Sequence, residues 1–341
     1  MNNIKKIIVY LLLIFIIVFS INYLLNSLNQ SKKLNLEKEI SFNQELNHSI
    51  NLGIDFLYNA QLKDGEFSTY SCSEKEMINC YYDSSPFVTT FVLYSINEIN
   101  NSKTIEIKEK ALNFLLNEQE NGLWSYWTKK NENKLYYDLD DTSCSSFILK
   151  QNNIIFQDNI PLIKNNKNNE SLYYTWIDPI RFENDIDCAV NVNILLYLQE
   201  NDFHVCSYIN NAIKNNENCS IYYPDKFALY YLVSRAYANN ITCLNQTKEK
   251  IISEILSKYK QNKNFENSLQ TALVINTILN FEYNNKKTLE LLISDLIKNQ
   301  NKNGSWNRSS FYIQPKSVHY GSEELTTAIS IEALNNYLNN F

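Results

Sequence analysis

The chain repeats one local pattern: an amphipathic helix that ends in Gln, a turn that contains Gly, and an aromatic residue two positions after that Gly. Three of the five glycines of the chain, Gly65, Gly122 and Gly304, belong to this pattern. Gly takes the left-handed backbone conformation that follows a helix, and the Gln side chain can bond backbone groups that are free there. A helix and turn repeated in this way predict an array of helical hairpins.

We expect six helical hairpins in residues 46–341. Their second helices are the more apolar set, and a helix that is apolar nearly all round is buried. The expected fold is therefore all-α, a single (α/α)6 toroid of about 300 residues with an inner and an outer ring, which is acceptable for one core. The expected outer helices are 46–60, 104–118, 153–164, 205–215, 246–260 and 286–300, and the expected inner helices are 86–99, 140–152, 184–199, 223–238, 266–281 and 322–339.

An apolar run of nineteen residues, 7–25, follows Lys5 and Lys6 near the N-terminus. A run of this length nearly spans the core of a bilayer, and no convincing small-residue cleavage site follows it. We expect a transmembrane signal-anchor over residues 1–25, with a cleaved signal peptide as the alternative. Residues 26–45 are polar and charged and are expected to form a stalk. Residues 46–341 would then be a membrane-anchored domain, exported to the extracytoplasmic side.

The seven cysteines are compatible with either side of a membrane. Cys72 and Cys80 lie in one expected loop, and Cys206 and Cys219 flank one short helix, so two local disulfides are expected outside the cell. Cys144 and Cys188 lie at similar positions on successive expected helices, where one interpretation is that both are small buried thiols. Cys243 is left over. No Cys/His spacing indicates zinc, and we expect neither a metal nor a cofactor.

A run of acids opens one expected inner helix. Asp138, Asp140 and Asp141 lie within four positions and are followed by Thr-Ser and an apolar stretch. One Asp is enough to cap a helix. Carboxylates crowded together repel, so at least one is expected to have a raised pKa and to hold a proton, as a general acid must. Simple capping with one solvated spare acid stays open as the alternative.

The first residues of the inner helices converge on one rim of a toroid, so further polar and aromatic residues there are candidates for substrate binding. A second acidic cluster, 183–187, opens the next inner helix, and capping is again the alternative. Arg235 lies deep in an apolar helix, where a charge needs a partner. The candidate substrate-binding residues are Asp185, Asp187, Tyr137, Trp127, Trp176, His319 and Glu323.

These motifs resemble those of the terpenoid cyclase and prenyltransferase alpha-alpha toroid superfamily. The Gln-x(2–3)-Gly-x-Trp/Phe turns resemble the QW motifs of squalene–hopene cyclases, and residues 138–143 resemble the DxDD-T-A motif of class II terpene cyclases. The resemblance implies that Asp140 protonates a double bond or an epoxide, with Asp138 and Asp141 as its partners. It also implies that aromatic faces in the cavity stabilise carbocations.

Two other functions remain open. An exported carbohydrate-active toroid would need two carboxylates that face each other across a wet groove. A non-catalytic binding protein would have its acids paired with Arg or used as helix caps. The expected partner is a small molecule, either an apolar isoprenoid or a glycan. The net charge of −6, with no basic cluster in the body of the chain, argues against nucleic acid, and the sequence leaves the oligomeric state undetermined.

Overall fold

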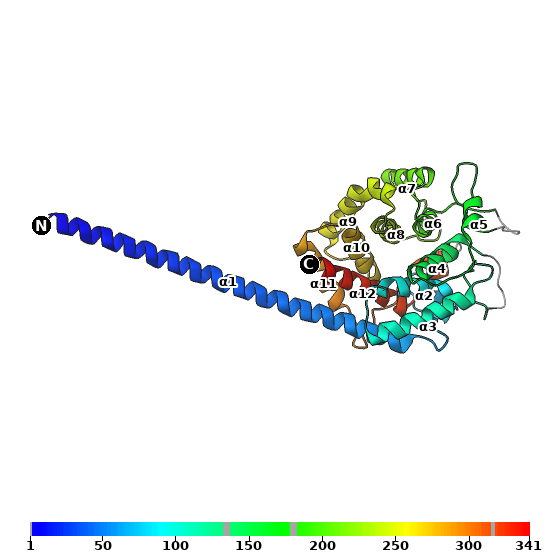
Figure 1. Ribbon diagram of the computed structural model, residues 1–341, viewed down its shortest axis with the longest axis horizontal. Coiled ribbons are helices and arrows are strands. Elements are labelled where there is room, and N and C mark those ends of the chain that lie inside the picture. The colour runs from blue at the N-terminus through cyan, green and yellow to red at the C-terminus, as the bar shows by residue number, and fades with distance from the viewer. Residues whose placement is uncertain (1, 132–136, 178–182, 315–317) are drawn as a thin grey trace. The chain divides into compact units, whose positions relative to one another are not determined.

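The computed structural model describes residues 2–131, 137–177, 183–314 and 318–341 (Figure 1). The chain divides into two compact units, Met1–His48 and Ser49–Phe341. Helix α1 (Asn2–Ala60) forms the described part of the first unit, and its last residues belong to the second. In the described part of the chain, no helix combines the length and the apolar character needed to cross a membrane. Most side chains of residues 7–25 lie outside the described residues, and the anchor stays a prediction.

The buried helices of the second unit form a closed ring. Nearly all side chains of these helices are buried, as their apolar character predicts. Each helix contacts the next one, and the last contacts the first, as the arrangement in Figure 1 illustrates. The ring consists of α2 (Pro86–Ile96), α4 (Leu139–Gln151), α6 (Cys188–Leu198), α8 (Lys226–Ala238), α10 (Ser268–Asn280) and α12 (Glu323–Asn340).

Amphipathic helices pack against the outside of this ring. In α3 (Ser102–Glu118), for example, Ile107, Ala111, Phe114 and Leu115 are buried at the spacing of a single helix face. The other outer elements are α5 (Ile160–Asn165), α7 (Phe203–Asn215), η1 (Thr242–Thr247), α9 (Lys248–Asn262) and α11 (Lys286–Lys298). The expected two-layer helical architecture is confirmed for the described residues.

One expected outer helix is much shorter than predicted. The sequence predicts a helix over 153–164, but α5 begins only at Ile160. Asn153 has a positive φ of 57°, which ends the preceding helix instead of starting a new one. Pro161 lies in the first turn of α5, the position where its missing N–H costs least.

The structure adds a small antiparallel sheet that an all-α prediction omits. The strands are β1 (Tyr70–Cys72), β2 (Cys80–Tyr82), β3 (Tyr312–Gln314) and β4 (Val318–Gly321), and their order is β2-β1-β4-β3. Each strand has only three or four residues, too few to show a strand periodicity in the sequence. The central pairing joins β1 to β4, which are far apart in the chain, so only tertiary structure reveals it.

The repeated turns have the predicted geometry. Gly304 has a φ of +90°, and a Cβ placed there would lie 2.1 Å from the carbonyl oxygen of Leu52. The Gln300 side-chain amide donates to the Ser49 and Gly304 carbonyls, each at 2.9 Å. Trp306 donates from its indole nitrogen to the carbonyl of Leu296 at 2.7 Å. These contacts close the end of α11 and tie it to the helix beside it.

Three disulfides are formed, and only one matches the expectation. Cys72–Cys80 is confirmed, while the others are Cys188–Cys219 and Cys206–Cys243. The predicted Cys206–Cys219 pair is wrong, because Cys206 lies in the first turn of α7 and Cys219 follows its end. From Cys206 to the end of α7 at Asn215 the helix runs for about 14 Å, and each of the two cysteines pairs with another partner instead. The remaining cysteine is a buried free thiol, Cys144.

Candidate active site

The three acids of the 138–141 run lie together, buried at the start of α4. Asp138 is the N-cap residue, and its Oδ1 accepts from the backbone N–H of Asp141 at 2.7 Å. Asp140 and Asp141 occupy the first turn of the helix. The exposed fractions of Asp138, Asp140 and Asp141 are 3%, 9% and 4%. Capping therefore accounts for Asp138, but it does not explain why two further carboxyl groups are buried beside it.

Asp140 is held by two donors from different elements. Its Oδ1 accepts from the amide of Asn193 on α6 at 2.6 Å, and its Oδ2 accepts from the hydroxyl of Tyr223 at 2.5 Å. Burial raises the pKa of Asp140, while the hydrogen bonds from Tyr223 and Asn193 and the positive charge of Arg235 act in the opposite direction. The site thus favours retention of a proton and also provides donors for the carboxylate that remains when the proton leaves.

Asp138 and Asp141 form a close pair. Burial and the neighbouring negative charges raise the pKa of both groups. One oxygen of each, Asp138 Oδ2 and Asp141 Oδ1, has no hydrogen-bond partner among the described residues. A buried, ionised carboxylate without a partner is costly, so the pair is suited to holding a proton.

A polar network continues from Asp140 into the ring of inner helices. Arg235 donates from Nη2 to Oδ1 of Asn193 at 2.6 Å, which orients the Asn193 amide so that its nitrogen faces Asp140. The guanidinium of Arg235 lies over the ring of Phe91 at 4.7 Å and over that of Tyr94 at 5.0 Å. The sequence predicts that the buried charge of Arg235 needs a partner, and the structure provides the amide oxygen of Asn193 and the faces of the aromatic rings of Phe91 and Tyr94.

An aromatic cluster packs beside the acids. Phe87 and Tyr312 meet with ring centroids 4.8 Å apart, Tyr223 and Phe311 at 5.5 Å, and Tyr312 stacks on Tyr320 at 5.2 Å. Burial raises the pKa of Tyr312, and the nearby negative charge of Asp141 acts in the same direction. We call the following set the aromatic cluster: Phe87, Phe91, Tyr126, Tyr223, Phe311, Tyr312 and Tyr320.

Two of the aromatic residues predicted from the sequence lie at the edge of this site. Trp127 contacts Tyr126 with ring centroids 5.2 Å apart and donates to Asp83 at 3.1 Å. The backbone of Trp176 forms an isolated antiparallel β-bridge with that of Asp138. The indole nitrogen of Trp176 donates to the Tyr222 hydroxyl at 3.0 Å.

The third predicted aromatic residue points to a different partner. Tyr137 donates to Glu120 at 2.5 Å, and this bond lies at an exposed position. The pKa of Tyr137 is raised to about 12 by burial and by the bond to Glu120.

In the second acidic cluster, Asp187 and one oxygen of Asp185 accept hydrogen bonds, while Asp185 Oδ1 has no hydrogen-bond partner among the described residues. Asp187 is the N-cap residue of α6, and its Oδ1 accepts from the N–H of Ala189 at 2.6 Å. Burial raises the pKa of Asp187 to about 6. Asp185 accepts from the Tyr222 hydroxyl at 2.6 Å and from the indole of Trp176 at 3.3 Å.

The two remaining candidates lie near β4 and the start of α12. His319 contacts Ser310 at 3.0 Å, and burial lowers its pKa. His319 and Tyr320 are neighbours in β4, so their side chains point to opposite faces of the sheet. Tyr320 is the one that joins the aromatic cluster. Glu323 is half-exposed and lies 3.8 Å from Arg308.

Sequence reasoning missed several residues that the structure brings to the acids. Asn193 is the clearest case, and a signal existed: with Asn191 it is one of two amides inside a buried helix that is otherwise apolar, where an amide needs partners. Phe87, Phe311 and Tyr312 carried no such signal, because apolar residues in a predicted helix or loop look the same whether they fill a core or line a site. Arg181, a second cation near the 183–187 cluster, lies outside the described residues.

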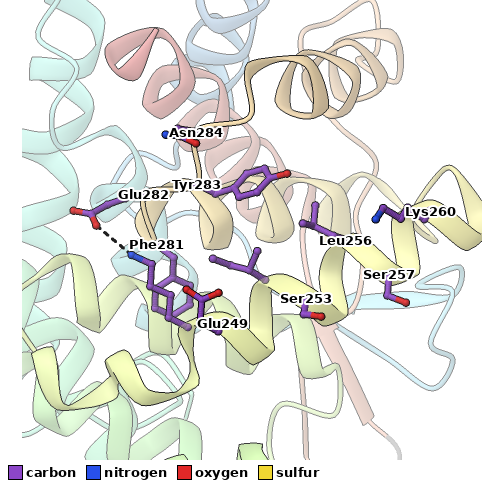
Figure 2. Close-up of a pocket in the computed structure, with 11 residues that line it drawn as sticks. Glu249, Ser253, Leu256, Ser257, Lys260, Phe281, Glu282, Tyr283 and Asn284 are labelled. Atoms are coloured by element: carbon purple, nitrogen blue, oxygen red, sulfur yellow. Dashed lines mark hydrogen bonds and ion pairs between the residues drawn. The ribbon is translucent and has the colours of Figure 1, made fainter.

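Two other features of the described residues bear on the site. Among the described residues, no group of three or more His, Cys, Asp and Glu side chains could hold a metal ion. Figure 2 shows a pocket of about 550 Å³ between α9 and the connection from α10 to α11, lined by residues such as Lys260, Phe281 and Tyr283. Its lining includes none of the acids of the 138–141 run and no member of the aromatic cluster.

Comparisons with known proteins identify the fold. No family model and no curated protein matches the sequence. Among solved structures, the type II terpene cyclase MstE from Scytonema, in complex with its substrate geranylgeranyl dihydroxybenzoate, matches with a TM-score of 0.66 and 14% identity over 89% of this chain and 100% of that chain. The fold is that of a type II terpene cyclase.

Two further solved structures are similar. A protein from Actinoplanes has a TM-score of 0.66 and 13% identity, covering 86% of this chain and 99% of that chain. The ent-copalyl diphosphate synthase from Streptomyces platensis has a TM-score of 0.53 and 11% identity, covering 74% of this chain and 50% of that chain. The terpenoid cyclase-like toroid expected from the sequence is therefore confirmed, and at these identities the likeness concerns the fold.

Proposed function

We propose that this protein is an acid-initiated, class II-like terpenoid cyclase in which Asp140 donates the proton. The observation that carries the proposal is the burial of three carboxyl groups beside the aromatic cluster at the start of α4. Asp140 is the most exposed of the three, so it is the acid best placed to meet a ligand. Asp138 and Asp141 are its partners and hold a further proton between them.

The first step is the transfer of a proton from a carboxylic acid to carbon. The O–H bond of Asp140 breaks, a C–H bond forms at a double bond of the substrate, and positive charge develops on the neighbouring carbon. Asn193 and Tyr223 stabilise the carboxylate left on Asp140, because both donate hydrogen bonds to it. An epoxide would be opened in the same way, with the proton going to oxygen.

The aromatic cluster supports the later steps. The faces of aromatic rings attract positive charge, and they do so more strongly where water is excluded. Tyr223 belongs to the cluster and also bonds Asp140, so the acid and the rings share one site. Ring closure moves the positive charge along the chain of the substrate, and loss of a proton or capture by water ends the reaction.

An isoprenoid is the substrate class that fits best. The rings beside the acids are apolar, and the MstE structures that share this fold contain geranylgeranyl dihydroxybenzoate or merosterolic acid A. A glycan is less well supported, because Asp187 caps a helix and Asp185 is bonded by Tyr222 and Trp176. The roles of Asp185, Asp187, Tyr137, Trp127, Trp176, His319 and Glu323 in substrate binding stay predictions.

We also infer that the domain is a complete (α/α)6 toroid, anchored in a membrane and facing the extracytoplasmic side. The closed order of the inner helices supports the hairpin number. The apolar run of residues 7–25 supports the anchor. Three disulfides support an oxidising compartment, since such bonds are rare in the cytosol.

A second function is favoured by Arg235. This buried cation bonds Asn193, which in turn bonds Asp140, and its Nε has no hydrogen-bond partner among the described residues. A fixed positive charge so near the acid opposes a carbocation formed close to it. The alternative is therefore a toroid that binds an apolar or anionic small molecule without converting it.

Deuterium labelling separates the two functions. The full chain in a non-ionic detergent is incubated in D2O with geranylgeranyl dihydroxybenzoate, and products are followed by mass spectrometry. A cyclase yields a cyclised product that contains a single deuterium at the protonated carbon. Asp140→Asn is expected to abolish this product while ligand binding persists. The matched control is Asp55→Asn, an exposed acid that pairs with Lys103 on the outer surface. Binding without deuterium incorporation by the natural protein would leave only the binding function.

A further inference from the structure

The segment between α7 and α8 supplies one of the two donors to Asp140. Tyr223 lies in this segment, just before α8 begins, and its hydroxyl donates to Asp140 at 2.5 Å. Residues 217–224 contain no helix or strand that could set the position of the Tyr223 side chain. Contacts outside the segment must therefore hold it.

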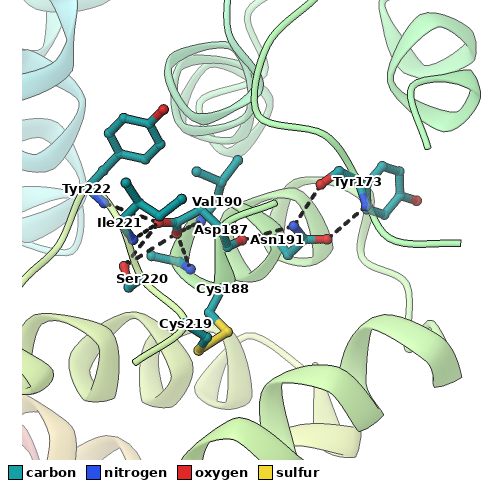
Figure 3. The surroundings of a disulfide bond; sticks show 10 residues. Tyr173, Asp187, Cys188, Val190, Asn191, Cys219, Ser220, Ile221 and Tyr222 are labelled. Atoms are coloured by element: carbon teal, nitrogen blue, oxygen red, sulfur yellow. Dashed lines mark hydrogen bonds between the residues drawn. A yellow bond between two sulfur atoms is a disulfide. The ribbon is translucent and has the colours of Figure 1, made fainter. Parts of the chain in front are cut away.

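Asp187 makes the first of these contacts. One of its oxygens, Oδ1, accepts from the N–H of Ala189 and caps α6. The other oxygen, Oδ2, accepts from the backbone N–H groups of Ile221 and Tyr222 and lies 3.3 Å from the hydroxyl of Ser220 (Figure 3). A single buried carboxylate thus joins the start of α6 to three successive residues of the segment that carries Tyr223.

Capping alone does not require this arrangement. Asp138 caps α4 with one oxygen, and its other oxygen has no hydrogen-bond partner among the described residues. Asp225 caps α8 with one oxygen, and its other oxygen accepts from Gln270. Of these three caps, Asp187 is the one whose second oxygen binds backbone N–H groups of a neighbouring segment.

A disulfide reinforces the same junction. Cys188 follows Asp187 in the chain and is bonded to Cys219, which precedes Ser220 (Figure 3). The backbone N–H of Cys188 also donates to the carbonyl of Cys219 at 2.9 Å. The residues immediately before Tyr223 are therefore fixed to α6 by a covalent bond and by several hydrogen bonds. Asn193, on the same helix α6, supplies the other donor to Asp140.

We propose that Asp187 and the Cys188–Cys219 disulfide together form a positioning device that holds the Tyr223 hydroxyl against Asp140. The inference rests on the proposed function, in which Asp140 is the acid. Asp187 is then a positioning residue that never contacts the substrate. This assignment replaces the substrate-binding role that its place in an acidic cluster suggested.

Loss of the device has a defined consequence at Asp140. The titratable and charged groups around this acid are Asp138, Asp141, Tyr223, Arg235, Asp187 and Cys144. The hydrogen bond from Tyr223 lowers the pKa of Asp140, so displacement of the hydroxyl raises it. A residue that only stabilised the fold would leave this titration unchanged.

The test compares four variants of the full chain by carboxyl NMR, with the Asp140 signal assigned by Asp140→Asn. Tyr223→Phe defines the pKa rise caused by loss of the hydroxyl. Asp187→Asn keeps an oxygen to cap α6, since Asn is a good N-cap, but sets an amide against the N–H groups of Ile221 and Tyr222. The third variant is Cys188→Ser/Cys219→Ser, and Cys206→Ser/Cys243→Ser is the matched control, because that disulfide lies outside the junction.

We expect Cys188→Ser/Cys219→Ser, which removes no charge beside Asp140, to raise the pKa of Asp140 in the same direction as Tyr223→Phe, and not to raise it further when Tyr223→Phe is already present. Asp187→Asn also removes a negative charge that is coupled to Asp140, and this loss by itself lowers the pKa of Asp140. Its effect is therefore read as a difference: the change in the pKa of Asp140 caused by Asp187→Asn should be more positive in the natural protein than in Tyr223→Phe. Equal changes in the two backgrounds overturn the proposal, and so does a rise in the double Cys variant that persists with Tyr223→Phe. If the double Cys variant fails to fold, Asp187→Asn decides alone. The readout needs no turnover, so absence of cyclase activity would reject the proposed function without touching this result.

Discussion

Glu332 provides a sharp test of the electrostatics inside the ring of helices. Its carboxyl group is buried on α12 and accepts from the hydroxyls of Ser95 and Tyr231, each at 2.8 Å. Burial raises the pKa of Glu332 from 4.5 to about 7, and the two hydrogen bonds and the charge of Arg235 only partly oppose this rise. Below pH 7 the group is therefore mainly a neutral acid in the folded state.

The sign of the effect on stability follows from this rise. A group whose pKa is higher in the folded than in the unfolded state contributes stability below the unfolded pKa and loses it as the pH rises through the folded pKa. For Glu332 the loss spans pH 4.5 to about 7. A difference of about 2.5 pH units, at about 1.4 kcal/mol per unit, corresponds to about 3 kcal/mol.

Glu332→Gln removes the ionisation and keeps an oxygen that can accept from Ser95 and Tyr231. Any cost of the new amide N–H groups is the same at every pH, so the prediction concerns the change with pH. Relative to the natural protein, the variant should gain about 3 kcal/mol in the free energy of unfolding between pH 4.5 and a pH above 7. Guanidinium titrations of the full chain in non-ionic detergent at both pH values measure this gain.

A control with the opposite sign strengthens the test. Tyr231→Phe removes one donor to the Glu332 carboxylate, so its stability should fall more steeply with rising pH than that of the natural protein. If the natural protein and Glu332→Gln show parallel curves over this pH range, the pKa of Glu332 is the same in the folded and unfolded states and the reasoning is wrong.

Two further predictions concern the turns and the thiols. Gly304→Ala should destabilise the toroid by at least about 1 kcal/mol, because Gly304 has a φ of +90° and a Cβ would lie 2.1 Å from the Leu52 carbonyl oxygen. Thermal unfolding measures this loss of stability. Gly53→Ala is the comparison with the smaller expected loss, because a Cβ at Gly53 would contact the flexible side chain of Ile331 and not a backbone carbonyl. The non-reduced protein should show one free thiol, Cys144, which burial keeps protonated and unreactive until the chain is denatured. Two or more thiols in denaturant would contradict the disulfide pattern.

Local rules predicted the helical parts of this protein well. Amphipathic and apolar periodicities placed most helices within a few residues, and the Gly turns followed from the conformational freedom of Gly. The 138–141 acids were recognisable because three carboxylates exceed what a helix cap needs. These features depend on residues within one or two helical turns of each other, so the chain carries them wherever it packs.

The composition of the site was decided by tertiary structure. Asn193 on α6 and Tyr223 in the α7–α8 segment donate to Asp140, and Arg235 on α8 bonds Asn193. No local pattern states which side chains from different helices will meet. The prediction of a Cys206–Cys219 disulfide failed for the same reason, because packing brings Cys243 to Cys206 and Cys188 to Cys219 instead.

The sequence alone therefore determined a helical toroid with a run of acids at the start of one inner helix, because periodicity, turn chemistry and charge crowding are local properties. Only the tertiary structure decided which donors hold each acid, which cysteines pair, and that the second acidic cluster binds the segment carrying Tyr223. Those outcomes depend on distances between residues far apart in the chain, which the closing of the ring sets.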